Sequence, residues 1–417
     1  MKTLIRNIGQ IAGIVEAGVM RKEGVSMSET GTLENAWLLI EDDKIACFGS
    51  MSDCPDLSQE SGQDSFDVID ADGGFVLPAF CDSHSHIVFA GTREQEFLDK
   101  IKGLSYAEIA AHGGGILNSA DLLHNTSEDE LYRQAMERVN EMMAKGTGAI
   151  EIKSGYGLTT QDELKILRVI KRIRDNSPAI IKSTFLGAHA VGRAFAGRQS
   201  EYVDHVCNEM IPAVAAEHLA DFVDVFCEDG FFTPEETDRI LTAGEHYGMR
   251  VKLHANQLAV SGGVQVGVKH NALSVDHLES TTDEEIRVLK DSCTMPTMLP
   301  GASFFLRMQY GKALDFINSG LGIALASDYN PGSSPCGDMR FVMSLGCIQM
   351  RLTPIQALNA CTLNSAYAMG ISDVAGSITA GKLANLIITK RIPSLTWIPY
   401  CYQTPFIDRV ILRGRTV

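Results

Sequence analysis

The sequence contains no apolar run long enough to cross a membrane, since none approaches the roughly 20 residues that a transmembrane helix needs. A secretory signal peptide is not indicated either, because Arg6, Asn7, Gln10 and Glu16 interrupt any apolar segment of about 7 to 15 residues near the start. We therefore expect a cytoplasmic protein that binds no membrane.

Closely spaced cysteines are also missing. The ten cysteines are scattered along the chain and none forms a Cys-x-x-Cys pair, which argues against a zinc–thiolate site or a redox dithiol. We expect reduced and mostly buried thiols.

Positive charge is scarce. With 36 Lys and Arg against 52 Asp and Glu, the formal net charge is -16 at pH 7. Nucleic acids attract basic patches, so we expect no nucleic-acid partner. A small anionic substrate would need cations placed locally in the site.

Eight short apolar runs alternate with segments of helical periodicity, such as 161–174 and 234–247. The runs cover residues 75–80, 148–152, 180–186, 222–226, 250–253, 273–275, 294–299 and 322–326. Apolar strands alternating with amphipathic helices are typical of parallel sheets, and eight of them favour a closed (β/α)8 TIM barrel, with a doubly wound open sheet as the alternative.

The two ends of the chain have a different pattern. Residues 36–49 read as a β-hairpin around Asp42 and Asp43, and 383–389 read as a further strand. We expect both termini to form one small β-sandwich domain beside the barrel. The predicted boundaries are 1–77 and 370–417 for the β domain and 78–369 for the barrel.

Several apolar runs end in residues that can bind a metal. His84 and His86 stand at i and i+2, so on a strand their side chains point the same way. Functional residues of a barrel lie past the carboxyl ends of its strands, where this sequence places Lys153, His189, Glu228, His254, His277 and Asp328. Imidazole and carboxylate ligands suit zinc or iron, and His84, His86, His254 and Asp328 would leave a position open for water.

These motifs resemble the metal-dependent amidohydrolase superfamily, which has His-x-His after strand one, single histidines after strands five and six, and an aspartate after strand eight. The flanking segments 68–71 and 376–386 also match, although Asn385 replaces an expected aspartate. Within the superfamily, the chain most resembles enzymes of histidine degradation that hydrolyse 4-imidazolone-5-propanoate to N-formimino-L-glutamate. The motifs carrying this resemblance span residues 89–94, 113–116, 151–158, 188–190, 274–279 and 327–333.

The resemblance implies one zinc or iron ion per chain, bound by His84, His86, His254 and Asp328. A second metal is not expected, because Lys153 follows the second strand and Glu228 stands after the fourth, where some amidohydrolases carry a bridging lysine. Asp328 would carry a proton from water to the departing nitrogen, with His277 as a second candidate. The alternative for His277 is a buried structural histidine.

The resemblance also implies a set of substrate-binding residues. Arg93 would bind the propanoate arm, since its guanidinium can hold a carboxylate through two hydrogen bonds. Gln257 cannot act as a base and would hydrogen-bond the ring. The remaining predicted members are Tyr156, His189, Asn330, Gly332 and Ser333. The Gly113–Gly115 run lacks the Lys-Ser or Lys-Thr of a phosphate loop and predicts a loop near the barrel mouth.

Two other functions remain open from the sequence. A deaminase or another cyclic-amide hydrolase of the same superfamily would share the metal ligands without needing the set of Arg93, Tyr156 and His189. A non-catalytic metal or ligand binder could keep the fold without the chemistry. The family suggests a homodimer.

Overall fold

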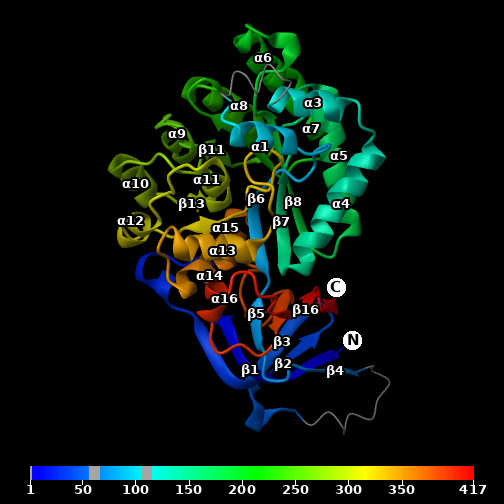
Figure 1. Ribbon diagram of the computed structural model, residues 1–417, viewed down its shortest axis with the longest axis vertical. Coiled ribbons are helices and arrows are strands. Elements are labelled where there is room, and N and C mark those ends of the chain that lie inside the picture. The colour runs from blue at the N-terminus through cyan, green and yellow to red at the C-terminus, as the bar shows by residue number, and fades with distance from the viewer. Residues whose placement is uncertain (1, 56–65, 105–114) are drawn as a thin grey trace.

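The protein folds into a parallel barrel and a smaller β domain that contains both ends of the chain (Figure 1). The computed structural model describes residues 2–55, 66–104 and 115–417. The strands of each domain form their own sheet, and the helices gather around the barrel sheet (Figure 1).

The barrel sheet is entirely parallel, as predicted. Its strands follow one another in sequence order from β6 to β14. They are β6 (Phe80–Ser85), β7 (Thr147–Lys153), β8 (Ile180–Ala188), β9 (Phe222–Cys227), β10 (Arg250–Val251) with β11 (Leu253–Ala255), β12 (Ser274–His277), β13 (Met295–Met298) and β14 (Ala324–Leu325). The backbone N–H of Asp328 donates to the carbonyl of His84 at 3.0 Å, and that of His86 donates to Tyr329 at 2.8 Å. These bonds join the two ends of the sheet and bring the loop after β14 beside β6.

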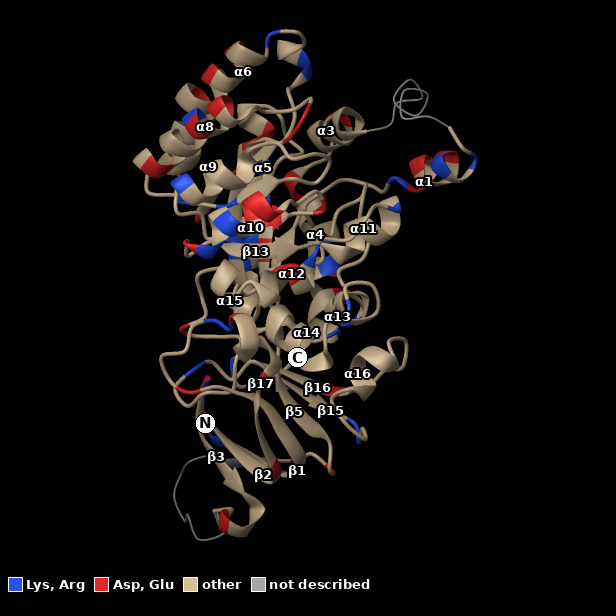
Figure 2. Cartoon of the chain, turned by 90° about the vertical axis from the view of Figure 1, so that its left-hand side faces the viewer, with Lys and Arg blue, Asp and Glu red and all other residues tan. Residues whose placement is uncertain are grey.

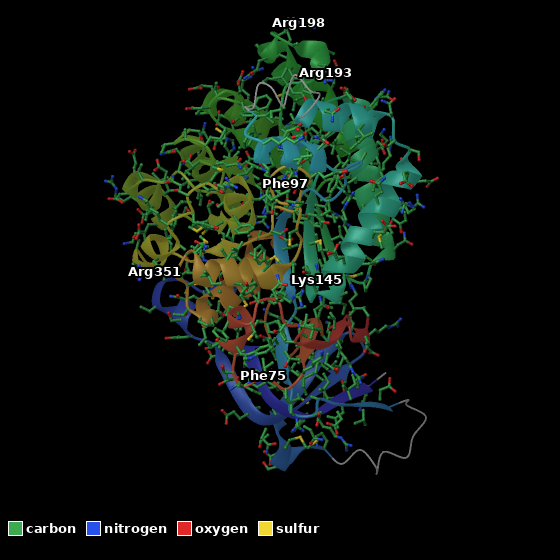
Figure 3. All side chains as sticks on the ribbon, in the orientation of Figure 1. Phe75, Phe97, Lys145, Arg193, Arg198 and Arg351 are labelled. Carbon is green, nitrogen blue, oxygen red and sulfur yellow. The ribbon has the colours of Figure 1, made fainter. Side chains whose placement is uncertain are left out.

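The prediction for the first barrel strand was wrong. The run 75–80 is divided at Ala79: β5 (Phe75–Pro78) pairs with β1 and β15 of the terminal sheet, and β6 begins at Phe80. Ala79 donates its N–H to the carbonyl of Asn385, whereas Phe80 donates to Gly146 at the start of the barrel. One apolar run therefore serves both domains. Figure 3 shows Phe75 in the lower domain, well apart from Phe97 on the barrel.

Helices lie between the barrel strands and begin with the expected signals. Thr159 caps α5 (Thr160–Asn176), and Thr233 caps α8 (Pro234–His246) with proline in the first turn. Other helices that cover the barrel include α4 (Glu128–Ala144), α9 (Gly263–Lys269), α10 (Asp283–Lys290), α13 (Met339–Ile348), α14 (Pro354–Cys361) and α15 (Leu363–Ala368). Short helices on the loops include α1 (Glu94–Ile101), α3 (Ile116–His124), α6 (Gln199–His205), α7 (Ile211–Ala216), α11 (Pro300–Leu306) and α12 (Ala313–Asn318). Helix α1 projects from the body of the barrel (Figure 2).

The terminal domain is a mixed sheet with the order β17-β16-β15-β5-β1-β2-β3, and β4 also pairs with β1. The chain enters it twice, which confirms a β domain built from both termini. Its strands are β1 (Lys2–Ile14), β2 (Gly31–Glu41), β3 (Lys44–Ser50), β4 (Phe66–Asp70), β5, β15 (Leu386–Thr389), β16 (Ile407–Leu412) and β17 (Arg415–Thr416). The predicted hairpin is β2–β3, in which Asp42 takes a positive φ of 54°.

None of the helices in the described part of the chain combines the length and the apolar composition that crossing a membrane requires.

Candidate active site

A cavity of about 240 Å³ opens at the carboxyl ends of the barrel strands. Every residue predicted for metal or substrate binding lines it, except His84, which lies fully buried beneath. The described lining consists of His86, Arg93, Glu96, Lys100, Gly115, Ile116, Tyr156, His189, Phe226, Phe231, His254, Gln257, His277, Asp328, Asn330, Gly332 and Ser333.

The two histidines of β6 point to the same side of the strand, as their spacing predicts. Their Nε2 atoms lie 3.3 Å apart, and both are 3.6 Å from Oδ1 of Asp328. Burial, together with positive charge on neighbouring groups, lowers the pKa of His84 and His86 well below the ordinary value. Both imidazoles are therefore neutral and able to bind a cation through nitrogen.

His254, on β11, lies beside these two histidines. Its ring centroid is 4.4 Å from that of His84, and the side-chain nitrogens of His84, His86 and His254 lie within 4.8 Å of one another. A second group, within the same limit, contains His84, His277 and Asp328.

Buried carboxylates orient two of these imidazoles. Nδ1 of His84 lies 2.7 Å from Asp276, and Nδ1 of His254 lies 2.9 Å from Asp224. Because a carboxylate only accepts, Nδ1 carries the proton and Nε2 presents its lone pair to the cluster. Such carboxylate–histidine pairs are typical of histidines that bind metals.

The cluster fits a metal ion. Ligand nitrogens at about 2.0–2.1 Å from a tetrahedral ion lie roughly 3.4 Å from one another, close to the spacing of the atoms of His84, His86 and Asp328. In a neutral His84, the lone pair of Nε2 faces Nε2 of His86, an arrangement that a cation between them would stabilise. The two groups around His84 offer imidazole nitrogens and a carboxylate oxygen, which are ligands that zinc and iron take.

Asp328 and His277 have strained backbones. Their φ angles are 52° and 92°, in the left-handed region that favours glycine, and Leu278 follows at 64°. Strain of this kind gathers at functional sites, where the surrounding structure compensates for its cost. It turns both side chains toward the cavity.

His277 is buried and lines the cavity, and its side-chain partner is a carboxylate. Its Nδ1 lies 3.3 Å from Oε2 of Glu279. The side chain of Glu279 is buried, and its Oε1 accepts a hydrogen bond from Ser303 at 3.2 Å. Burial opposes a charge on His277, but the carboxylates of Glu279 and Asp328 outweigh burial and raise its pKa to about 9. Burial also raises the pKa of Asp328. The pair can therefore hold a proton between them.

A layer of charged residues, which was not predicted from the sequence, lies beneath the cluster. Nζ of Lys153 lies 2.8 Å from both Glu151 and Asp224 and 3.7 Å from Asp276. Nζ of Lys252 lies 3.6 Å from Glu151 and 3.7 Å from Asp276. All five side chains are fully buried. Lys153 therefore neutralises the carboxylates that orient His84 and His254.

A pattern in the sequence could have found this layer. Ionisable residues stand two apart at three strand positions of the barrel, in the pairs Asp82 and His84, Glu151 and Lys153, and Lys252 and His254. Residues at i and i+2 share a face of a strand. Charged residues with this spacing inside apolar runs indicate a polar barrel interior.

Arg93 lies at the start of α1 on the other side of the cavity. Its Nε donates to Oγ of Ser119 at 2.8 Å, and the guanidinium carbon Cζ lies 5.8 Å from the centre of the Tyr156 ring. Nη2 is buried and has no partner among the described residues. Lys100 also lines the cavity, with Nζ 3.5 Å from the carbonyl of Gly332. An otherwise acidic protein thus places two cations at one wall.

Tyr156 and His189 pack beside the histidine cluster. The ring of His189 stacks on that of His86 at 5.3 Å, and Tyr156 lies 5.5 Å from His189. Nδ1 of His189 donates to the carbonyl of Gly155 at 3.1 Å. The other ring nitrogen of His189 is then an acceptor.

The side chain of Asn330 holds the loop after Asp328 through hydrogen bonds. Oδ1 of Asn330 accepts from the N–H groups of Gly332 and Ser333 at 2.8 Å, and Nδ2 donates to Ser333 Oγ at 2.7 Å. Ser333 Oγ in turn lies 3.2 Å from Asp328 Oδ2. A side chain at position 332 would collide with Arg93, since a Cβ there would lie 2.4 Å from its Nη1.

Glu228 holds the loop of Gln257. Its carboxylate accepts from the backbone N–H of Gln257 and, at 3.3 Å, from that of Ala259. Glu228 therefore binds backbone amides of this loop.

Two features of the sequence lie elsewhere. Gly113 and Gly114 of the glycine run fall outside the described residues, whereas Gly115 lines the cavity and donates to Glu96 at 2.8 Å. Asn385 belongs to the terminal domain, where its Oδ1 accepts from the N–H of Arg413 at 2.8 Å. The replacement of the expected aspartate therefore leaves the site untouched.

Comparison with known proteins agrees with this architecture. The family model described as "Amidohydrolase family" matches residues 75–417. Proteins named imidazolonepropionase from Christiangramia forsetii and Alkaliphilus oremlandii are 51% and 36% identical to the chain. The first comparison covers 100% of both chains, and the second covers 99% of this chain and 97% of the relative.

Solved structures show the same fold at low identity. Guanine deaminase from E. coli superimposes with a TM-score of 0.75 at 13% identity, covering 100% of this chain and 99% of that one. A triazine hydrolase variant gives a TM-score of 0.73 at 15% identity, covering 100% and 94%. The chain is therefore a member of the amidohydrolase family and, within it, of the imidazolonepropionases.

Proposed function

We propose that this protein hydrolyses the cyclic amide of 4-imidazolone-5-propanoate to N-formimino-L-glutamate, a step of histidine degradation. The observation that carries the proposal is one cavity that joins the histidine cluster to the guanidinium of Arg93, whose buried Nη2 has no hydrogen-bond partner among the described residues. The cluster of His84, His86, His254 and Asp328 could hold a metal ion that promotes attack of water on the ring carbonyl. Arg93 could bind the propanoate carboxylate of the substrate. The full-length similarity to proteins named imidazolonepropionase supports the same assignment.

A metal ion is implied by the family and by the histidine cluster, and we propose zinc or iron, both of which take imidazole and carboxylate ligands. When bound, such an ion lowers the pKa of a coordinated water to about 7 and polarises a carbonyl oxygen. Metal analysis of protein purified without added metal would separate zinc from iron.

Asp328 is the proposed proton carrier. Its carboxylate can take a proton from the attacking water as the water oxygen bonds to the ring carbonyl carbon. It can then deliver that proton to the ring nitrogen as the carbon–nitrogen bond breaks. The acyl carbon becomes a carboxylic acid, which releases its remaining water proton to solvent to give the carboxylate, and the departing nitrogen becomes the N–H of the formimino group, so atoms and charge balance. His277, held by Glu279 on its other side, can donate a hydrogen bond to the developing oxyanion or share the proton.

The proposed ring and arm contacts come from both walls of the cavity. Arg93, assisted by Lys100, would bind the propanoate carboxylate, and Tyr156 and His189 would hold the neighbouring part of the substrate. Gln257, Asn330, Gly332 and Ser333 would contact the ring through side-chain or backbone groups.

The direct test follows the absorbance of 4-imidazolone-5-propanoate, generated in place from urocanate by urocanase, on addition of purified protein. We expect rapid loss that a chelator abolishes, with N-formimino-L-glutamate as product. No acceleration by metal-replete protein would contradict this substrate and favour another cyclic amide or an aminated heterocycle.

Replacing Arg93 separates the proposal from other reactions of the family. R93A removes the bidentate partner of the carboxylate, so we expect KM to rise about 10- to 100-fold, the effect of losing one charge-assisted hydrogen-bonded pair. An unchanged KM would favour a deaminase or a hydrolase of neutral rings. A homodimer is a further proposal, which light scattering coupled to size-exclusion chromatography would test.

A further inference from the structure

The loop that carries Tyr156 is built around one buried carboxylate. Glu163, in the first turns of α5, accepts from the backbone N–H of Gly155 at 3.0 Å through Oε2. Its Oε1 accepts from Gly157 at 2.7 Å and from Leu158 at 2.9 Å. The side chain is fully buried, and its carboxylate accepts hydrogen bonds from three of the five backbone N–H groups of residues 154–158.

Two glycines allow the loop to approach so closely. Gly155 has a φ of +107°, and a Cβ there would lie 2.9 Å from Nδ1 of His189. A Cβ on Gly157 would lie 2.4 Å from the backbone nitrogen of Glu163. The loop therefore packs directly against α5 on one side and against His189 on the other.

The same loop also holds His189. The carbonyl of Gly155 accepts from Nδ1 of His189 at 3.1 Å, and Oγ of Ser154 accepts from the N–H of Leu186 on β8 at 2.9 Å. One residue, Gly155, is thus hydrogen-bonded to Glu163 through its N–H and to His189 through its carbonyl. A shift of this residue would move two substrate-binding candidates together.

We propose that Glu163 is a positioning residue for substrate binding, which acts by holding Tyr156 and His189 at the cavity wall. The described lining of the cavity includes Tyr156 and His189 but not Glu163, so the carboxylate works through the loop and not by contact with substrate or metal. This inference rests on the proposed function, because it assigns a role in binding the same substrate.

A purely structural role would have a different signature. An acidic side chain near a helix N-terminus stabilises the helix through the partial positive charge of its first N–H groups. Its loss would lower stability but leave substrate affinity unchanged. The positioning role predicts a change in KM at constant metal content.

The variant Glu163→Gln tests this difference. A glutamine keeps one acceptor oxygen but turns an NH2 group toward an amide that needs an acceptor, so one of the three loop hydrogen bonds is lost. We expect KM to rise about tenfold, the equivalent of one hydrogen bond. We expect kcat to change by less than about threefold and the metal content to stay the same, because no metal ligand moves.

Glu285→Gln is the matched control. Glu285 on α10 is also buried and also accepts a backbone N–H, that of Thr282 at 2.8 Å, but it does not belong to the described lining of the cavity. The control should lose some stability and keep its KM. Equal changes of KM in both variants would contradict a specific role for Glu163.

Amide hydrogen exchange gives a readout that does not depend on turnover. In Glu163→Gln, the amides of 155, 157 and 158 should exchange at least tenfold faster than in the unmodified protein, while peptides of the terminal domain keep their rates. Unchanged exchange or an unchanged KM would overturn the inference. Should this variant not fold, Glu163→Asp, whose oxygens are withdrawn by one methylene, is read in the same way.

Failure of the proposed function is distinguishable from failure of this inference. Lack of turnover by the unmodified protein would contradict the function. Turnover by the unmodified protein with the same KM in Glu163→Gln would contradict only the positioning role.

Discussion

The interior of the barrel and the core of the terminal sheet are both buried β-structure, yet they are filled in opposite ways. Aliphatic side chains such as Ile5, Leu38 and Val76 fill the core of the terminal sheet. The barrel instead buries charged groups such as Lys153 and Asp224 beneath the metal-type cluster. The terminal sheet is organised for stability, whereas the barrel interior gives up stability to orient ligands.

Each charge in the barrel depends on its neighbours. Burial opposes the charge on Lys153, but Asp224, Glu151 and Asp276 outweigh it and raise the pKa of Lys153 above the ordinary value. Burial would raise the pKa of Asp224, but His254 and Lys153 outweigh it and lower that pKa. Lys153 and Asp224 therefore stabilise each other's charge, and removing one leaves the other buried without its partner.

The largest effect on activity is expected from Asp328→Asn in the barrel. The amide cannot take a proton from water, so turnover should fall about 10³-fold, the usual size of a lost general base. Stopped-flow or steady-state assays would measure this, with calorimetric substrate binding as the control. Turnover equal to that of the unmodified protein would contradict the mechanism.

Lys153→Met breaks the charged layer itself. It leaves the carboxylates of Glu151 and Asp224 buried without their shared cation, so we expect a loss of about 4 kcal/mol in the free energy of unfolding. The metal content should also fall, since Asp224 orients His254. Urea denaturation and metal analysis would measure the two effects. A variant as stable as the parent would mean that the layer has no structural function.

Leu38→Ala makes the corresponding change in the terminal sheet. Leu38 is fully buried, and its truncation should cost about 3 kcal/mol through lost burial and the cavity that remains. Metal content and kcat, measured well below the melting temperature, should be unchanged. A loss of metal from this variant would show that the two regions are coupled.

Asn385→Asp should have the smallest effect. Oδ1 of Asn385 accepts a backbone N–H, and its Nδ2 is buried without a partner in the described part of the chain. An aspartate would keep the acceptor and remove the unpaired donor at the cost of a buried charge. We expect the free energy of unfolding to change by less than about 1 kcal/mol, with kcat constant. A large change in kcat would give this position a role in the site.

Much of the barrel could be predicted because its signals are local. The spacing of His84 and His86 on a strand, and the position of His254 or Asp328 after an apolar run, depend only on neighbouring residues. The division of 75–80 between two sheets could not be predicted, because both halves are equally apolar. Only their partners, β1 and β15 for one and β7 for the other, distinguish them.

By itself, the sequence determined which residues stand at strand ends and what chemistry they offer, since the periods of strands and helices are properties of the local chain. The tertiary structure decided which of these residues meet. Asp224 binds His254 and Asp276 binds His84 through contacts set by strand register and barrel closure. Such contacts join residues far apart in the chain, and no local pattern records the register that brings them together.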